Sequence, residues 1–367
     1  MVDGYYIGLM SGTSLDGIDA AVIHIENQQY KLCSSLEYKW PQNLATRIKQ
    51  LIEENDSLNE TLELDQLCAQ HFAKAALDCL TKAGLKPSQV VAIGSHGQTI
   101  RHKPKGNETY SLQIGNPSNI TELTEITTVA DFRNRDIAAA GQGAPLAPAF
   151  HQAAFHHPKK QRVIVNIGGI ANITLLNKNQ DIIGYDTGPG NRLLDDWIFK
   201  TQQSKFDLDG KFAASGKIIP ELLQHLLNDP YFKLKAPKST GTDYFNLTWL
   251  NNHLNSFQNE QPKDIQATLS ALTATTITDQ IKQITTSNAE VFICGGGFHN
   301  TFLTQLIDQQ LPNASVGSTE ILGIHPDWVE AMTFAWLAQQ AISKLPGNIP
   351  SVTGAKGPRI CGGIYFK

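Results

Sequence analysis

Small hydroxyl residues, glycines and two aspartates gather near the N-terminus, in the stretch GLMSGTSLDGIDAAVI at residues 8–23. Apolar runs flank this polar knot, so we expect it to form a turn between two strands. Glycine lets a backbone approach a ligand closely, and the amide and hydroxyl groups of such a turn can donate hydrogen bonds to phosphate oxygens. The stretch therefore predicts a phosphate-binding turn.

Two more glycine turns follow predicted strands, NIGGIANIT at 166–174 and CGGGFHN at 294–300. A single glycine turn is more often only a turn, but three of them after strands favour nucleotide binding. Other nucleotide signatures do not fit, because the chain has no GxxxxGK[ST] loop and no GxGxxG between a strand and a helix. The predicted ligand is a nucleotide held by strand-linked glycine turns.

Two carboxylates are candidates for proton transfer. Asp186 lies at the end of a predicted strand, before the glycines of GYDTGPGN, where its side chain can act as a general base. The alternative is that Asp186 only caps a helix beginning near Asn191. Glu330 lies early in the last predicted helix, where the helix dipole favours its charged form. Its alternative is an exposed position on a helix face.

Composition limits the class of protein. The chain has 367 residues, a net charge of −4, 41% hydrophobic and 17% charged residues, which is ordinary for two globular domains. No long basic run suggests nucleic acid, and no apolar run suggests a membrane span or a secretory signal. Five cysteines without a CxxC pair fit a reducing cytoplasm. We expect a cytoplasmic protein.

The elements that must position these residues occur twice along the chain. Each half reads as a strand, a glycine turn, two more strands and then helices, at roughly 1–130 and 160–345. This pattern predicts two α/β lobes with a cleft between them. We expect lobes at 1–132 and 133–349, with the tail 350–367 as a candidate to rejoin the first, and a polar, turn-rich segment at 104–125. The expected strands are 4–10, 18–25, 30–39, 90–96, 161–176 as a pair, 181–188 and 289–294, and the expected helices are 62–83, 264–285 and 327–344.

Seven stretches closely resemble the anhydro-N-acetylmuramic acid kinase family, in the superfamily of actin, sugar kinases and chaperone ATPases. They cover nearly the whole chain in order: GLMSGTSLDGID, GSHGQT, DFRNRDIAAAGQGAPL, VNIGGIANIT, DTGPGN, CGGGFHN and PDWVEAMTFAWLA. The resemblance implies two ribonuclease H-like lobes with an interlobe cleft. It also implies a phosphotransferase with an alcohol acceptor, which uses ATP and water to convert 1,6-anhydro-N-acetylmuramic acid into N-acetylmuramic acid 6-phosphate in cell-wall recycling.

The resemblance also assigns roles to residues. Asp186 is the implied base, and Glu330 would hydrogen-bond the attacking water or sugar hydroxyls. Mg²⁺ would be ordered through waters near Asp16 and Asp19, with no direct protein ligand, although Asp19 can instead be a strand residue with a backbone partner. The implied ATP-binding residues are Gly12, Thr13, Ser14, Leu15, Asp16, Gly17, Ile18, Asp19, Gly168, Gly169, Asn172, Gly295, Gly296 and Gly297.

The implied sugar-binding residues are His96, Gln98, Thr99 and Arg133. Arg133, rather than Arg135, is expected to bind the lactyl carboxylate, because a guanidinium can hold a carboxylate with two hydrogen bonds. Two alternatives stay open, that His96 is structural and that Arg133 pairs internally with Asp131 or Asp136.

The resemblance implies ATP and the anhydrosugar as partners, and a homodimer. Closure of the lobes about hinges near 127–145 and after 320 is expected to exclude bulk water. One competing interpretation is another sugar kinase or phosphatase of the superfamily, since fold does not fix function. A second is an ATP-driven binding or assembly protein, which would need a further domain that the sequence does not show.

Overall fold

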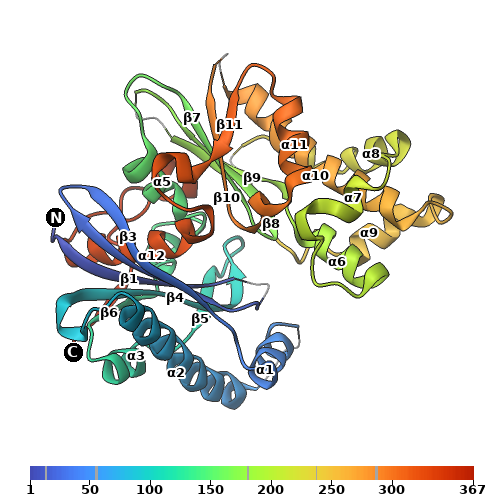
Figure 1. The fold of residues 1–367 in the computed structure, drawn as a ribbon. Helices are drawn as coiled ribbons and strands as arrows, with labels where there is room; N and C mark the ends of the chain where they lie inside the picture. The colour runs from blue at the N-terminus through green and yellow to red at the C-terminus, as the bar shows by residue number, and fades with distance from the viewer. Residues whose placement is uncertain (13–14, 54–56, 180–181, 237, 286–287) are drawn as a thin grey trace. The chain divides into compact units, whose positions relative to one another are not determined.

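The computed structural model describes residues 1–12, 15–53, 57–179, 182–236, 238–285 and 288–367 (Figure 1). The chain forms two compact units. Unit 1 contains Met1–Ala154 and Trp328–Lys367, and unit 2 contains Phe155–Asp327. Within the described ranges, no helix is long and apolar enough to cross a membrane.

The sheet of unit 1 has the strand order β12-β6-β4-β1-β2-β3, and β5 pairs with β4. Strands β1, β2 and β3 are antiparallel neighbours, whereas β4 runs parallel to β1 and to β6. Their bounds are β1 (Gly4–Ser11), β2 (Ile18–Glu26), β3 (Gln29–Tyr38), β4 (Val90–Lys103), β5 (Tyr110–Ile114), β6 (Thr128–Ala130) and β12 (Gly363–Tyr365).

The sheet of unit 2 has the order β11-β10-β7-β8-β9. Here too the three strands that come first in the chain, β7, β8 and β9, are antiparallel neighbours, and β10 runs parallel to β7 and to β11. Their bounds are β7 (Arg162–Ile167), β8 (Ile170–Leu176), β9 (Ile182–Pro189), β10 (Glu290–Cys294) and β11 (Ser315–Ser318). Both units therefore repeat the ribonuclease H-like order, and the expected fold class of two such lobes is confirmed.

Helices pack on both faces of the unit 1 sheet (Figure 1). Ile7 and Leu9 of β1 join the apolar cluster formed with helix α2 (Leu58–Lys82). Alternation along the strand turns Gly8 to the opposite face, where a Cβ on Gly8 would lie 1.8 Å from the carbonyl oxygen of Ala331. Ala331 belongs to helix α12 (Val329–Ile342), which therefore lies directly on the backbone of the sheet.

Helix α10 (Pro262–Ile284) is the longest helix of unit 2 and is buried along most of its length. Its Leu269, Leu272 and Ile277 pack in one apolar cluster with residues of β7 and β8. The remaining α-helices of both units, in chain order, are α1 (Gln42–Glu53), α3 (Pro117–Thr124), α4 (Asn134–Ile137), α5 (Ala147–Phe155), α6 (Arg192–Gln202), α7 (Lys211–Ala214), α8 (Pro220–Leu227), α9 (Leu247–His253), α11 (Thr301–Gln310) and α13 (Pro350–Thr353).

The structure differs from the sequence-based expectations in two secondary-structure elements and in the bounds of the lobes. The segment 104–125 is not simply turn-rich, because it contains β5 and α3, and the strand expected at 90–96 continues to Lys103. Residues 133–154 and 328–349 lie in unit 1, not in the second lobe.

Buried polar contacts explain this grouping. The fully buried carboxylate of Asp136 accepts hydrogen bonds from the Gly143 amide at 2.8 Å, Asn348 Nδ2 at 2.6 Å and Thr353 Oγ1 at 2.7 Å. Strand β12, near the C-terminus, pairs with β6. Both contacts join the C-terminal segment to unit 1, and neither is local in sequence.

Candidate active site

A buried hydroxyl group, that of Ser11, holds the first glycine turn in place. Ser11 Oγ, at the end of β1, lies 2.8 Å from the Gly17 carbonyl and 2.7 Å from Gln98 Oε1, and it accepts a hydrogen bond from Trp40 Nε1 at 3.1 Å. Trp40 is a contributor that the sequence reasoning missed. These contacts fix both ends of the turn at 12–17, of which Thr13 and Ser14 lie outside the described residues.

Backbone groups dominate the described part of this turn. The Gly12 carbonyl accepts hydrogen bonds from the Leu15 amide at 3.3 Å and from Gln98 Nε2 at 3.3 Å. A Cβ on Gly17 would lie 2.7 Å from the Tyr38 carbonyl oxygen, so this position requires glycine. The Ile18 side chain is fully buried in the core, so only its backbone is available to a ligand.

Asp16 and Asp19 are the carboxylates expected to order Mg²⁺. Asp16 is exposed and Asp19, which pairs with Met10 and Glu37 in the sheet, is partly exposed. Carboxylates are the oxygen ligands that Mg²⁺ takes, usually beside several waters. Among the described residues, no group of three or more histidines, cysteines, aspartates or glutamates is placed to hold a metal. Asp16 and Asp19 therefore offer carboxylate oxygens of the kind that Mg²⁺ takes, and their part in ordering the ion stays a prediction.

His96 and Arg133 form a pair in unit 1. The Arg133 guanidinium donates to Nε2 of His96 from Nε at 3.2 Å and from Nη2 at 2.8 Å, and Nη1 donates to the Gly143 carbonyl at 2.8 Å. Burial, followed by the Arg133 charge, holds the pKa of His96 well below its usual range. His96 is therefore neutral and accepts at Nε2.

Arg133 keeps donors for a ligand. Three of the five N–H groups of a guanidinium are used by His96 and Gly143, and no described contact pairs Arg133 with Asp131 or Asp136. Burial lowers the pKa of Arg133 to about 10, whereas the negative charge of Glu330 raises it. The side chain stays positively charged at neutral pH, so it can bind an anionic group.

Gln98 and Thr99 differ in what they offer a substrate. Gln98 is fully buried, and its amide is used by Ser11 and Gly12. Thr99 is partly exposed, and its hydroxyl accepts a hydrogen bond from Gln113 Nε2 at 3.3 Å. Gln98 therefore supports the turn at 12–17 through its contacts with Ser11 and Gly12.

Glu330 lies in the first turn of α12 and is partly exposed. The close packing of α12 on Gly8 and Gly94 sets the position of this turn relative to the sheet, since a Cβ on Gly94 would lie 2.0 Å from the Phe334 carbonyl oxygen. The ring of Phe334 also contacts His96, with a centroid distance of 4.7 Å. Unit 1 thus brings together Glu330, Arg133 and His96.

The second glycine turn, in unit 2, joins β7 to β8 and supports the start of α6. The amides of Gly190 and Arg192 donate to the Gly169 carbonyl at 2.9 and 3.2 Å, and the Asn191 amide donates to the Gly168 carbonyl at 2.8 Å. A Cβ on Gly190 would lie 2.3 Å from the Gly168 carbonyl oxygen, so the GPGN turn needs glycine there.

A row of polar residues crosses this end of the unit 2 sheet. Asn172 of β8 pairs with Asn166 of β7 on one side and with Asp186 of β9 on the other. Paired residues in neighbouring antiparallel strands point to the same face of a sheet. Asn166 was not among the predicted site residues, although its place at the end of an apolar strand was a signal for it.

Asp186 is held by the segment 238–240. Its Oδ2 accepts a hydrogen bond from the Thr240 amide at 3.0 Å, and its own amide donates to the Lys238 carbonyl at 3.2 Å. It does not cap α6, whose N-cap is Asn191. Burial raises the pKa of Asp186 to about 6, while the Thr240 amide and the Lys238 charge lower it. A carboxylate with a pKa near neutrality can both accept and release a proton.

The third glycine turn begins after β10. A Cβ on Gly295 would lie 2.4 Å from Asn166 Oδ1, and one on Gly297 would lie 2.3 Å from Ile167 Cγ2, so both glycines pack against the end of β7. At Gly296 the nearest atom would be Asn191 Nδ2, at 3.8 Å. Gly296 is exposed, and it is the position where the backbone is open to a ligand.

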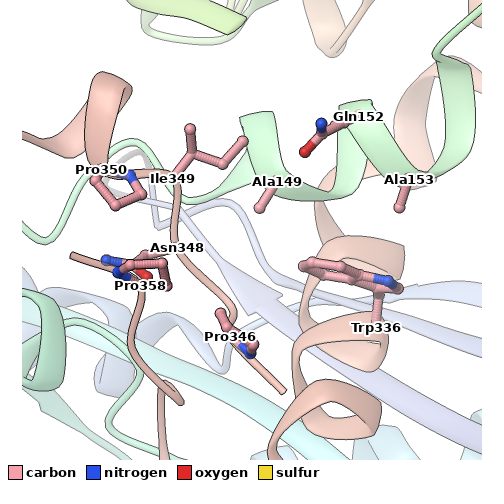
Figure 2. Close-up of a pocket in the computed structure, with 9 residues that line it drawn as sticks. All are labelled: Ala149, Gln152, Ala153, Trp336, Pro346, Asn348, Ile349, Pro350 and Pro358. Atoms are coloured by element: carbon pink, nitrogen blue, oxygen red, sulfur yellow. The ribbon is translucent and has the colours of Figure 1, made fainter. Parts of the chain in front are cut away.

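Figure 2 shows a pocket of about 370 Å³ in unit 1. Its lining is mainly apolar, and none of the candidate residues belongs to it. The lining consists of Ala149, Gln152, Ala153, Trp336, Pro346, Asn348, Ile349, Pro350 and Pro358.

Comparison with known proteins covers the whole chain. A family model described as anhydro-N-acetylmuramic acid kinase matches residues 4–367. A protein of that name from Pseudomonas syringae pv. syringae (strain B728a) is 47% identical over 365 residues, which are 99% of this chain and 100% of that protein. Another, from Nitrosospira multiformis, is 46% identical over 366 residues, 100% of both chains.

Solved structures with a similar fold are more distant. An activator of 2-hydroxyisocaproyl-CoA dehydratase from Clostridium difficile, with bound ADPNP, has a TM-score of 0.46 at 12% identity and covers 94% of this chain and 99% of its own. A ROK family glucokinase from Streptomyces griseus, in complex with glucose and AMPPNP, has a TM-score of 0.43 at 13% identity and covers 92% and 100%. At these scores the likeness adds nothing to the topology described above.

Proposed function

The chain belongs to the anhydro-N-acetylmuramic acid kinase family, and from this premise we propose which of its residues carry the reaction. It is an ATP-dependent kinase that opens 1,6-anhydro-N-acetylmuramic acid and phosphorylates O6, giving N-acetylmuramic acid 6-phosphate for cell-wall recycling. Water adds at C1, the C1–O6 bond breaks, and O6 takes the γ-phosphoryl group as ADP leaves. Such a reaction needs a base for water and charge neutralisation at the phosphates.

Asp186 is the general base in this proposal. The observation that carries it is the Thr240 amide, which holds Oδ2 at 3.0 Å, while Oδ1 receives no hydrogen bond from a described residue. Oδ1 is thus the oxygen that takes the proton from the attacking water. Glu330 would accept a second hydrogen bond from that water or from sugar hydroxyls, which helps to orient them.

Arg133 binds the lactyl carboxylate of the sugar in this proposal. Its remaining N–H donors and its retained charge support that role, because a partly buried cation is best compensated by an anion. Neutral His96 holds the guanidinium plane in place through Nε2, and Thr99 is proposed to contact the sugar. Gln98 supports the phosphate turn instead.

The ATP phosphates are proposed to bind the amides of the turns at 12–17 and 168–169, with Asn172 and the turn at 295–297 as further contacts. Asp16 and Asp19 would hold Mg²⁺ through waters. When bound, the ion neutralises negative charge on the phosphates. Omission of Mg²⁺ should abolish turnover, and turnover that persists in EDTA would contradict this assignment.

The test is a coupled assay of ADP release with 1,6-anhydro-N-acetylmuramic acid, Mg²⁺ and ATP. Asp186→Asn should lower kcat by about 10²–10⁴-fold, whereas Asp209→Asn, an exposed carboxylate of the same unit, should match the wild type. Equal turnover of Asp186→Asn and wild type would move the base to another residue. In ¹⁸O-labelled water one labelled oxygen should appear at C1. An unlabelled product, or turnover only with an ordinary sugar, would favour the alternative of another sugar kinase.

Assembly and compartment are also proposals. We expect a homodimer, as the family resemblance implies, and light scattering of the purified chain at micromolar concentration tests it. We expect a cytoplasmic enzyme, because its co-substrate is ATP and all five cysteines are free thiols. Recovery of the activity in the periplasmic fraction of fractionated cells would contradict the cytoplasmic assignment.

A further inference from the structure

Three residues of unit 2 close a ring of contacts around the proposed base. The Asp186 amide donates to the Lys238 carbonyl at 3.2 Å. Lys238 Nζ reaches the Tyr231 carbonyl at 3.4 Å and lies 4.7 Å from the centroid of the Tyr231 ring. The Tyr231 hydroxyl donates back to the Asp186 carbonyl at 2.7 Å. Each residue of the ring is therefore fixed by the other two.

Lys238 is unusual for a lysine in this position. Only 5% of its surface is exposed, although lysines are almost never fully buried without a paired charge. Burial lowers the pKa of Lys238, and the charge of Asp186 raises it. Its neighbour Lys235, three residues earlier, is exposed. Among the described residues its ammonium contacts one backbone carbonyl and one aromatic ring, while its backbone carbonyl accepts from the Asp186 amide. Burial of an ammonium group costs desolvation energy, so its presence here calls for a role.

We propose that Lys238 is a positioning residue for the general base, which keeps Asp186 ionised and, through the segment 238–240, leaves Oδ1 as its proton-accepting oxygen. The inference rests on the proposed role of Asp186 and adds the residue that controls it. Lys238 transfers no proton and touches no reacting atom in this scheme.

Among the titratable groups around Asp186, Lys238 supplies the positive charge that favours the ionised carboxylate. Lys238 and Tyr231 are the titratable side chains that interact with Asp186 among the described residues. Burial raises the pKa of Tyr231, so its phenol stays neutral. The pKa of Asp186 is about 6, with Lys238 among the causes that lower it. Loss of the ammonium should therefore raise this pKa further and protonate part of the base at neutral pH.

The experiment compares the pH dependence of kcat/KM, which reports groups of the free enzyme, in wild type, Lys238→Met, Lys238→Gln, Lys238→Arg and the control Lys235→Met. Both neutral variants should move the acid limb to higher pH by roughly one unit, with activity recovering at alkaline pH. Lys238→Arg keeps the positive charge and should therefore keep the acid limb of the pH profile at its wild-type position. Lys235→Met should leave the profile unchanged.

Three outcomes would separate the explanations. An acid limb that stays in place in folded Lys238→Met or Lys238→Gln overturns the role of Lys238, as does an equal loss of activity at every pH, which is the sign of a structural residue. Urea unfolding at pH 8 shows which variants are folded. If Lys238→Met does not fold, Lys238→Gln is used in its place. Retained turnover in Asp186→Asn would instead overturn the base assignment itself.

Discussion

Arg133 and His96 illustrate how burial sets the chemistry of single residues. An exposed histidine is partly protonated near neutral pH. Burial and the neighbouring guanidinium hold the pKa of His96 well below the usual value of a histidine. Neutral His96 then accepts two donors from Arg133. These contacts fix the direction of the guanidinium, which would lower the ordering cost if Arg133 binds an anion, as proposed.

Arg133→Lys tests this at the residue scale. Lysine keeps the charge but cannot reproduce the planar fork, so KM for the anhydrosugar should rise about 10–100-fold, corresponding to about 1.5–3 kcal/mol for hydrogen bonds to a charged group. We expect a smaller change in kcat and none in KM for ATP. Steady-state kinetics of both substrates measure the split. The control is Arg135→Lys, because Arg135 is exposed; an equal rise in both variants would contradict the assignment of Arg133.

At the scale of elements, glycines in strands control where a helix can lie. Gly8 of β1 and Gly94 of β4 are paired across the unit 1 sheet and face α12. Their missing side chains allow the helix backbone to rest on the strand backbone, which is the close approach for which glycine is used in strands. This packing sets the place of Glu330 at the start of α12.

Gly8→Ala should displace α12. The added Cβ would lie 1.8 Å from a backbone carbonyl oxygen, and overpacking of this kind costs about 1–3 kcal/mol or more. We expect a lower urea midpoint and a loss of kcat, because Glu330 moves with the helix. Gly363→Ala is the matched control, since its nearest contact would be 3.7 Å away. Equal stability of the two variants would contradict the close packing.

The third glycine turn gives a second prediction at this scale. Gly297→Ala should lower the free energy of unfolding, because its Cβ would lie 2.3 Å from Ile167 Cγ2. Gly296→Ala should leave stability within about 0.5 kcal/mol but raise KM for ATP, since the methyl group would occupy the open side of the turn. Urea titration and ATP kinetics separate these effects. An unchanged KM for ATP in Gly296→Ala would remove this turn from the nucleotide site.

For the molecule as a whole, buried ionisable groups make stability depend on pH. His96 and His151 are buried, and burial lowers the pKa of His151 to about 3 and that of His96 well below its usual value. Unfolding returns both to about 6.5, so the unfolded chain binds more protons below that pH. Asp186 acts in the opposite sense below pH 6, because its folded pKa is raised.

The free energy of unfolding should therefore fall as the pH drops from 7 towards 6, with each histidine contributing up to about 1.4 kcal/mol per pH unit once its unfolded form is protonated. Below pH 6 the raised pKa of Asp186 should reduce the slope. Urea titrations at pH 7.5, 6.5, 5.5 and 5 measure this. His151→Gln should reduce the slope, whereas His225→Gln, at an exposed site, should not. Stability that does not change over this range would contradict the prediction.

The amino-acid sequence by itself determined the repeated order of strands and glycine turns, the family, and the candidate residues of the two glycine-rich halves. Local signals carry that information: strands alternate or are apolar throughout, and turns that approach phosphate need glycine. Asp186 at a strand end was visible for the same reason, and so was the helix expected at 327–344, which is α12 and begins within two residues of its expected start.

Tertiary structure decided what those residues touch. The sequence placed residues 133–154 and 328–349 in the second lobe, but the contacts of Asp136 with Asn348 and Thr353 join segments more than 200 positions apart. No local pattern encodes such a contact. Gln98 is buried against Ser11 beside the turn at 12–17, a contact that its place in the sequence did not indicate, and its expected role in sugar binding stays a prediction. Lys238 was not singled out, because a lysine in a polar loop is ordinarily exposed and only the fold buries it against Tyr231 and brings its backbone to that of Asp186.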